Sequence, residues 1–117
     1  MKLSDRQRIL KIIKTGQELL RHISDTNISR EMIRTNTTVQ WTITTPLYNI
    51  GEHTNHISKE LQAKHPEIPC RQISGMRHRL VHDYADTDWD IVNDVIFRGL
   101  PSYLEQLVPL LPELPGN

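Results

Sequence analysis

A cluster of basic side chains lies between residues 71 and 84, and its residue types suit chemistry on a phosphate. The cluster consists of Arg71, Arg77, His78, Arg79 and His82, and Asp83 is the only acid among them. Arginine can donate two parallel hydrogen bonds to a phosphate. Histidine has an ordinary pKa of about 6.5, so it can take up and release a proton near neutral pH. Cleavage of a phosphodiester by a neighbouring hydroxyl needs such a base, such an acid and positive charge near the phosphorane.

Arg77 and His82 make the main geometric demand on the fold. On an ideal helix, residues five apart are separated by roughly 140° of rotation, so these two side chains would not share a face. Both could reach one cleft if the helix unwinds near Val81, or if two copies of the helix meet across a symmetric dimer. Two copies would also complete the set of base, acid and phosphate-binding groups. The alternative is that these side chains are solvated charges at a helix end.

His78 and His82 stand four residues apart, a spacing that could present two nitrogens to a metal from one helix face. Two imidazoles do not complete a ligand set, and the carboxylate of Asp83 points elsewhere on an ideal helix. We therefore expect neither a metal nor another cofactor.

The N-terminal helix is predicted by a capping box in which Ser4 is followed three residues later by Gln7. Apolar residues then recur at helical spacing as far as Ile23 and give the helix one buried stripe. The helix is predicted to end between Asp25 and Asn27.

The second segment could be a strand, because residues 37–45 are rich in β-branched side chains. However, mostly apolar positions step by three or four from Met32 to Leu61, and a strand would not keep that register over such a length. We therefore predict one long helix from about Ser29 to Leu61, with Pro46 bending or interrupting it.

Two further helical segments follow a polar turn. Pro69 can begin the third helix, because its missing N–H does no harm at that position. The core stripe of this helix consists of Ile73, Met76 and Leu80. The last segment is predicted to open at Thr87 or Asp88, and Pro101 to split it in two. Its inward-facing residues are predicted to be Ile91, Val92, Val95, Ile96, Leu100, Leu104, Leu107 and Leu111.

These patterns together predict an all-α fold, a bundle of four to five mostly antiparallel helices. The length of 117 residues suits one shared core, so residues 1–117 are expected to form one domain. Trp41 and Trp89 are expected to be packing anchors rather than platforms for base stacking.

The overall charge limits the kind of nucleic-acid binding that is possible. Fourteen basic and fourteen acidic side chains cancel, so any phosphate must be bound by a local patch. The single cysteine, Cys70, cannot form an intramolecular disulfide, and the N-terminus has no signal-like apolar run. Both features favour a cytoplasmic location. The longest apolar runs are too short to span a membrane.

The spacing Arg77, four residues, His82, one residue, Tyr84 resembles the signature of the HepT-like toxins, a branch of the HEPN superfamily. The residues around it, Gly75-Met76-Arg77 and Leu80-Val81-His82-Asp83-Tyr84, are similar as well, and so is an Ile50-Gly51-Glu52 element in the preceding helix. The resemblance implies a HEPN-type up-and-down bundle that dimerises. It also implies a metal-independent endoribonuclease whose cleft lies at the dimer interface, with Arg77 and His82 as catalytic residues. Expected supporting residues are His78, Arg79, Asp83 and Glu52.

The same resemblance implies partners. RNA would be the substrate, and an MNT-type nucleotidyltransferase would be the antitoxin that transfers AMP onto Tyr84, whose alternative role is packing at a helix end. Many HEPN proteins have Asn where this chain has His78, a residue that can carry charge. The competing hypothesis is a non-catalytic helical dimer that binds a nucleotide or docks a nucleotidyltransferase.

Overall fold

The computed structural model of the chain describes residues 2–81 and 87–116, and all regular secondary structure within these ranges is helical. The elements in chain order are α1 (Asp5–Asp25), α2 (Arg30–Thr35), α3 (Thr37–Asn55), α4 (Lys59–Lys64), α5 (Cys70–Val81), α6 (Trp89–Asp94), the π-helical η2 (Val95–Gly99), α7 (Leu100–Leu107) and the 3₁₀-helical η3 (Val108–Glu113). The predicted all-α fold is confirmed.

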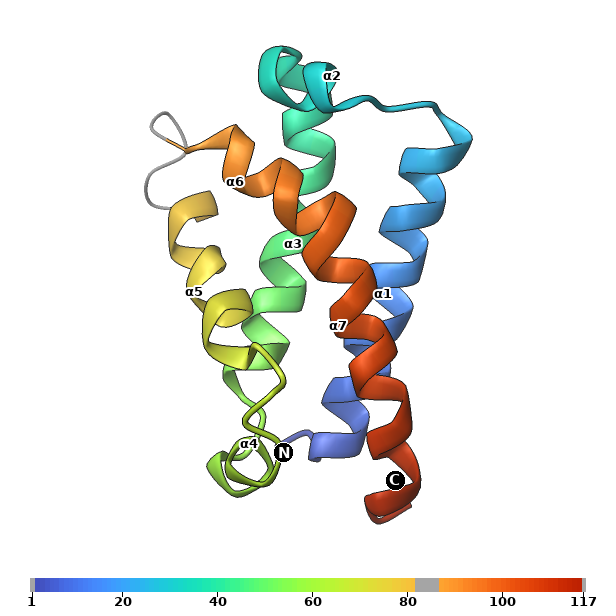
Figure 1. Cartoon of the computed structure of the whole chain (residues 1–117), viewed down its shortest axis with the longest axis vertical. Coiled ribbons are helices and arrows are strands. Elements are labelled where there is room, and N and C mark those ends of the chain that lie inside the picture. The colour runs from blue at the N-terminus through green and yellow to red at the C-terminus, as the bar shows by residue number, and fades with distance from the viewer. Residues whose placement is uncertain (1, 82–86, 117) are drawn as a thin grey trace.

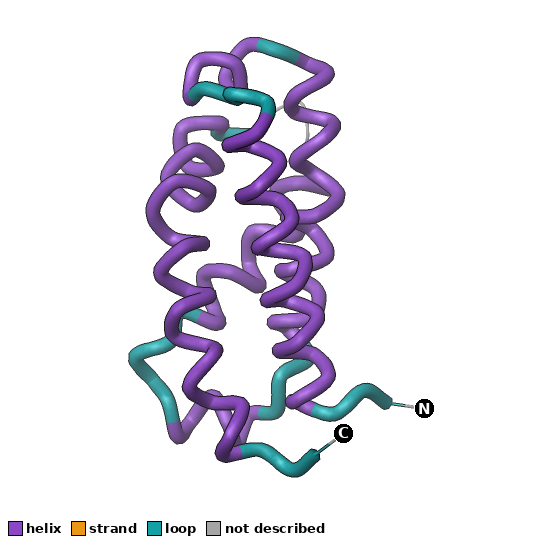
Figure 2. Tube along the Cα trace, turned by 90° about the vertical axis from the view of Figure 1, so that its right-hand side faces the viewer, coloured by secondary structure: helices purple, strands orange, loops and turns teal. Residues whose placement is uncertain are grey.

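The long helices run alternately up and down, as Figure 1 shows. Helix α1 rises, α3 descends, α5 rises, and the rod formed by α6, η2 and α7 descends, so both chain ends lie at the same end of the bundle. The short helices α2 and α4 cap opposite ends of the bundle, and the view in Figure 2 shows the rods side by side. The predicted up-and-down bundle is therefore confirmed.

The first helix begins where its capping box predicts. The hydroxyl of Ser4 accepts from the backbone N–H of Gln7, and the side chain of Gln7 accepts from the N–H of Ser4. The helix ends at Asp25, within the predicted range.

The predicted single helix from Ser29 to Leu61 is wrong, because the chain divides it into three. The first break is at Asn36, which has extended backbone and caps α3 by accepting from the N–H of Val39. The side-chain amide of Gln40 then donates to the carbonyls of Ile33 and Arg34. These bonds satisfy backbone groups that a continuous helix would otherwise pair, so the break costs little free energy of folding.

Pro46 does not end α3, which continues to Asn55. The second break comes instead at His56, and Ser58 caps α4. The carboxylate of Asp5 on α1 fixes this corner by accepting from both the N–H and the hydroxyl of Ser58. This contact between residues far apart in sequence stabilises the corner after the break.

The last rod begins as predicted, with Asp88 capping α6, but Pro101 does not split it. The chain stays helical from Trp89 to Glu113, and only the hydrogen-bond pattern changes. The N–H of Leu100 donates to Val95, five residues back, just before the proline that has no N–H to donate. The π-helical turn thus accommodates Pro101 without a break.

The core confirms most of the predicted stripes, including Ile73, Met76 and Leu80 of α5, all of which are buried. Trp89 is partly buried against the core, as expected. The predictions that Trp41 anchors the packing and that Ile91 faces inward are wrong, because Trp41 is 63% exposed and Ile91 is 40% exposed. Both positions follow from helix geometry, because their neighbours Gln40 and Val92 point inward and adjacent residues lie about 100° apart. Among the described residues, no helix is long and apolar enough to cross a membrane.

Candidate active site

Arg77 is held at the junction of α3 and α5 by two partners. Its Nε lies 3.5 Å from Oε2 of Glu52 on α3, and its Nη1 donates to the carbonyl of Ser74 one turn earlier on α5 at 3.1 Å. The side chain is only 19% exposed. The guanidinium is therefore oriented by its surroundings and does not move freely in solvent.

Glu52 belongs to a small polar network along one side of α3. Its Oε1 lies 2.9 Å from Nε2 of His56, one turn later, and Tyr48, one turn earlier, hydrogen bonds to the same carboxylate. Partial burial acts to raise the pKa of Glu52, but the hydrogen bond from His56, the positive charge of Arg77 and the Tyr48 bond outweigh it and lower that pKa. Glu52 is thus an anion at neutral pH and attracts Arg77.

Gly51 allows α3 and α5 to approach closely beside this pair. A Cβ at Gly51 would lie 3.1 Å from the carbonyl oxygen of Ile73 and 3.2 Å from Cβ of Arg77. Both separations are tighter than ordinary packing permits, so only glycine fits without a shift of one helix. The Ile-Gly-Glu element therefore has a physical role, since the glycine sets the helix separation and Glu52 then reaches Arg77.

The other basic residues of the cluster do not join Arg77. Arg71 and Arg79 line a hollow of ≈ 350 Å³ that also involves Gly75 of α5 and Ile91 of α6. His78 is exposed on α5. The basic stretch therefore covers more than one face of α5, and only Arg77 of these four residues meets Glu52.

The remaining residues of the sequence motif, His82, Asp83 and Tyr84, lie outside the described residues. The chain on either side of them is tied together, because the hydroxyl of Thr87 donates to the carbonyl of Arg79 at 3.0 Å. Thr87 therefore lies beside the last turn of α5, the turn that follows Arg77.

The family model described as Ribonuclease HepT-like matches residues 7–110, which include every element that builds this site. The chain belongs to the ribonuclease HepT-like family. The resemblance inferred from Arg77, His82 and Tyr84 is thereby confirmed at the level of the family.

Curated relatives carry names that agree with this family. "Putative RNase TTE0752" of Caldanaerobacter subterraneus subsp. tengcongensis is 32% identical over 62 residues, which cover 53% of this chain and 55% of that protein. "Putative RNase MJ1216" of Methanocaldococcus jannaschii is 26% identical over 91 residues, or 78% and 75% of the two chains. "Probable ribonuclease HepT" of Thermococcus cleftensis is 32% identical over 63 residues, or 54% and 57%. The matches to the first and third thus span little more than half of each relative. No solved structure matches the chain significantly.

Sequence reasoning missed His56 and Tyr48, which complete the polar network of this HepT-like chain. The signal that could have found them is spacing, because Tyr48, Glu52 and His56 stand four residues apart on one helix and so share a face. His56 is exposed, as is common for a polar residue at a helix end. Its exposure alone does not indicate that it pairs with Glu52.

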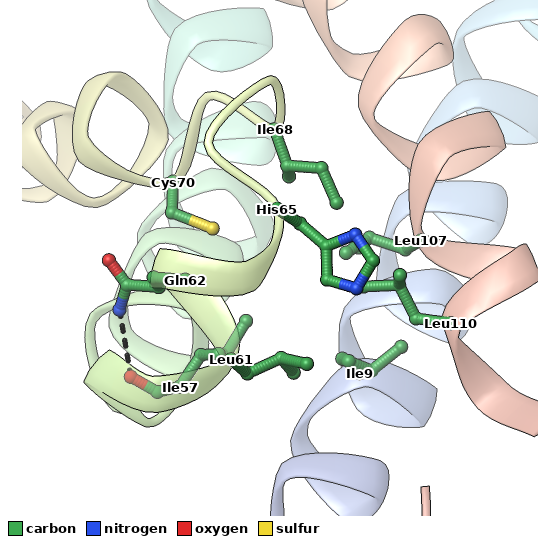
Figure 3. A pocket seen from close by; sticks show the side chains of 9 residues that line it. All are labelled: Ile9, Ile57, Leu61, Gln62, His65, Ile68, Cys70, Leu107 and Leu110. Carbon is green, nitrogen blue, oxygen red and sulfur yellow. Dashed lines mark hydrogen bonds between the residues drawn. The ribbon is translucent and has the colours of Figure 1, made fainter. Parts of the chain in front are cut away.

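A second candidate for a ligand-binding site is a small apolar pocket between α1, α4 and the C-terminal rod (Figure 3). Ile9, Leu61 and Leu110 line it, together with His65, whose two ring nitrogens lie 3.4 Å from Glu67 and Glu113. Its space of ≈ 10 Å³ is about that of one water, so it does not suit a nucleotide. Within residues 2–81 and 87–116, no three His, Cys, Asp or Glu side chains gather in a way that could hold a metal ion.

Proposed function

We propose that this chain is an endoribonuclease that cleaves RNA without a metal, as the toxin of a type II toxin-antitoxin system in the cytoplasm. The observation that carries the proposal is the fixed Arg77, which sits in the motif of a ribonuclease family and is oriented by Glu52 and Ser74. No cofactor is required by this proposal.

Arg77 has hydrogen-bond capacity left for a phosphate. A guanidinium has five N–H donors, and the contacts to Glu52 and Ser74 engage Nε and one N–H of Nη1. Within the described residues, no hydrogen bond or ion pair engages Nη2. An RNA phosphate that approaches Nη2 would receive donors whose direction is already set, and the interaction would strengthen as the phosphorane gains negative charge.

His82 would supply the proton transfers. A neutral imidazole takes the proton of the 2′-hydroxyl, the 2′-oxygen attacks phosphorus, and a protonated imidazole gives its proton to the leaving 5′-oxygen. The products are a 2′,3′-cyclic phosphate and a free 5′-hydroxyl. A homodimer supplies both imidazoles and both arginines, so the proposed cleft lies where two copies meet, with Arg79, His78 and Asp83 as supporting residues.

Tyr84 would be the regulatory residue of this cleft. Transfer of AMP from ATP onto its hydroxyl by an MNT-type nucleotidyltransferase would place a second phosphate near Arg77 and His82, and this phosphate would compete with RNA. The competing hypothesis, a dimer that only binds a nucleotide or docks such a transferase, keeps the cleft but requires no proton transfer.

The decisive experiment incubates the purified protein with total RNA in EDTA and compares cleavage with binding. We expect His82→Ala to abolish cleavage while leaving RNA binding nearly unchanged, and Arg77→Ala to reduce both. His22→Ala and Arg21→Ala are matched controls, because both side chains are exposed on α1. RNA that is bound but never cut by the wild-type protein would exclude the ribonuclease and favour the non-catalytic dimer.

A further inference from the structure

A polar pocket of ≈ 220 Å³ lies at the same junction of α3 and α5, on the side toward α4. Its exposed or half-buried lining residues are Asn55, Lys59, Gln62, Arg71 and Ser74, and the buried Thr54 and Cys70 complete the lining. This space is about twenty times that of the one-water pocket beside His65, so it is large enough for a phosphate group and part of its hydration.

This pocket is one helical turn from Arg77. Ser74 lines the pocket, and its carbonyl accepts the hydrogen bond from Arg77 Nη1. Asn55 lies three residues after Glu52, and Ser74 three residues before Arg77, on helices that run in opposite directions. Both steps lead the same way along the junction by about 4.5 Å. The pocket therefore lies beside the position of Arg77, along the same helix junction.

The charges of the pocket suit an anion. Lys59 and Arg71 contribute two cations, and neither forms an ion pair with any other described residue. No carboxylate of residues 2–81 or 87–116 lines the pocket, and the neighbouring Glu52 is already paired with Arg77 and His56. The Ser74 hydroxyl is engaged with the carbonyl of Arg71, and one N–H of Gln62 with the carbonyl of Ile57. Two cations without an ion-pair partner, together with the remaining amide donors of Asn55 and Gln62 and no acid among the described lining residues, form a site that attracts oxyanions.

The inner wall of the pocket is neutral. Burial raises the pKa of the Cys70 thiol, with smaller opposing contributions from a Tyr103 hydrogen bond and the charge of Lys59, so the thiol stays protonated at neutral pH. The hydroxyl of Thr54 is engaged with the Tyr103 hydroxyl at 2.7 Å. The nucleophilic thiolate of Cys70 is thus disfavoured and the Thr54 hydroxyl is engaged, so the pocket is better suited to holding a ligand than to reacting with it.

We propose that this pocket binds a backbone phosphate of the RNA strand, adjacent to the phosphate that Arg77 holds. The inference rests on the proposed function for the identity of the ligand. Lys59 and Arg71 would fix the register of the strand, so that the phosphodiester to be cut lies at Arg77. Binding of this phosphate would give a role to Lys59 and Arg71, which do not pair with Glu52 and take no part in the proposed chemistry.

The test measures binding of a 2′-O-methyl oligoribonucleotide, which has no 2′-hydroxyl and cannot be cleaved, over a range of salt concentrations. For single strands, the slope of log affinity against log salt decreases by about 0.7 for each phosphate that the protein no longer neutralises. We expect that decrease for Lys59→Ala and for Arg71→Ala, and partial rescue by Lys59→Arg. Lys64→Ala is the matched control, because this exposed lysine is on the same short helix but does not line the pocket. Circular dichroism checks that each variant is folded.

Cleavage of unmodified RNA, measured separately, distinguishes the two proposals. If the wild-type protein binds the oligonucleotide but cuts no RNA, the ribonuclease is excluded, yet a smaller salt slope in the Lys59 and Arg71 variants still supports the pocket. If both variants keep the wild-type slope, the phosphate site is wrong even when cleavage is normal. Binding of AMP or inorganic phosphate that depends on Lys59, without any binding of RNA, would overturn the RNA assignment and make the pocket a site for free phosphates. In an active protein, the KM of the two variants should rise more than kcat falls.

Discussion

The guanidinium of Arg77 and the carboxylate of Glu52 meet at 3.5 Å, directly beside Gly51, where α3 and α5 approach closely. The glycine sets the distance between the helices, and the carboxylate then sets the direction of the arginine. The candidate active site therefore depends on helix packing as much as on the sequence motif to which Arg77 belongs.

Glu52→Gln should slow RNA cleavage by about tenfold, equal to ~1.4 kcal/mol of transition-state stabilisation. The amide keeps one acceptor for Arg77 but loses the charge that attracts it. RNA binding should be unchanged or slightly tighter, because a negative charge near the phosphate is removed. The measurement is single-turnover kinetics beside equilibrium binding. Cleavage as fast as in the wild type would show that Arg77 does not need Glu52 for its orientation.

The contribution of Glu52 to the free energy of unfolding should change with pH only in acidic solution. Its pKa in the folded protein is below the ordinary value of 4.5, so its stabilising effect is fully present above that value and is lost as the pH falls through the lowered pKa. Because the side chain is 35% exposed, the effect should stay within about 1 kcal/mol. Urea unfolding of wild type and Glu52→Gln at several pH values checks this. A difference that grows as the solution is acidified would contradict it.

Gly51→Ala and Gly75→Ala should have opposite effects on thermal stability. Alanine favours a helix over glycine by about 1 kcal/mol, and at Gly75 nothing lies within 4 Å of the new Cβ, so that variant should melt higher. At Gly51 the new Cβ presses on the backbone of α5, and overpacking of this kind costs about 1–3 kcal/mol. Differential scanning calorimetry compares the two variants. Gly51→Ala should also cleave RNA more slowly. Equal melting temperatures of the two variants would show that α5 moves away from the new Cβ without loss of stability.

The purified protein should be a homodimer, because one Arg77 and one His82 do not supply both an acid and a base. Light scattering at micromolar concentration measures the mass in solution. Mixing His82→Ala chains with wild-type chains should inactivate the mixed dimers if both histidines act in one cleft. A monomer with full ribonuclease activity would end the proposal of a shared cleft.

Tyr84 should gain AMP when the chain is co-expressed with an MNT-type nucleotidyltransferase. Mass spectrometry of the peptide that contains Tyr84 detects the addition, and Tyr84→Phe should lack it. Tyr48→Phe is the control, because Tyr48 is engaged with Glu52 in the α3 network and should not affect the modification. The same added mass on the Tyr84→Phe protein would mean that another residue is the acceptor.

Local signals in the sequence were sufficient for the helix ends that local bonds decide. The capping box of Ser4 and Gln7 and the cap at Asp88 involve residues two or three apart, and both are where the sequence predicts. The predicted long second helix failed because its breaks depend on Gln40, which reaches back to α2, and on Asp5, which reaches across from α1. Periodicity alone cannot reveal such contacts, since the three- and four-residue repeat continues through both breaks.

The sequence by itself determined the helical class, the core stripe of α5 and the motif that identifies the family. Only the tertiary structure decided that Arg77 meets Glu52, that Lys59 and Arg71 share a pocket one turn away, and that Trp41 is exposed. The physical reason is range. Helix periodicity and caps follow from interactions within about four residues. The partners of a charged side chain depend on which helices pack together and on how closely a residue such as Gly51 lets them approach.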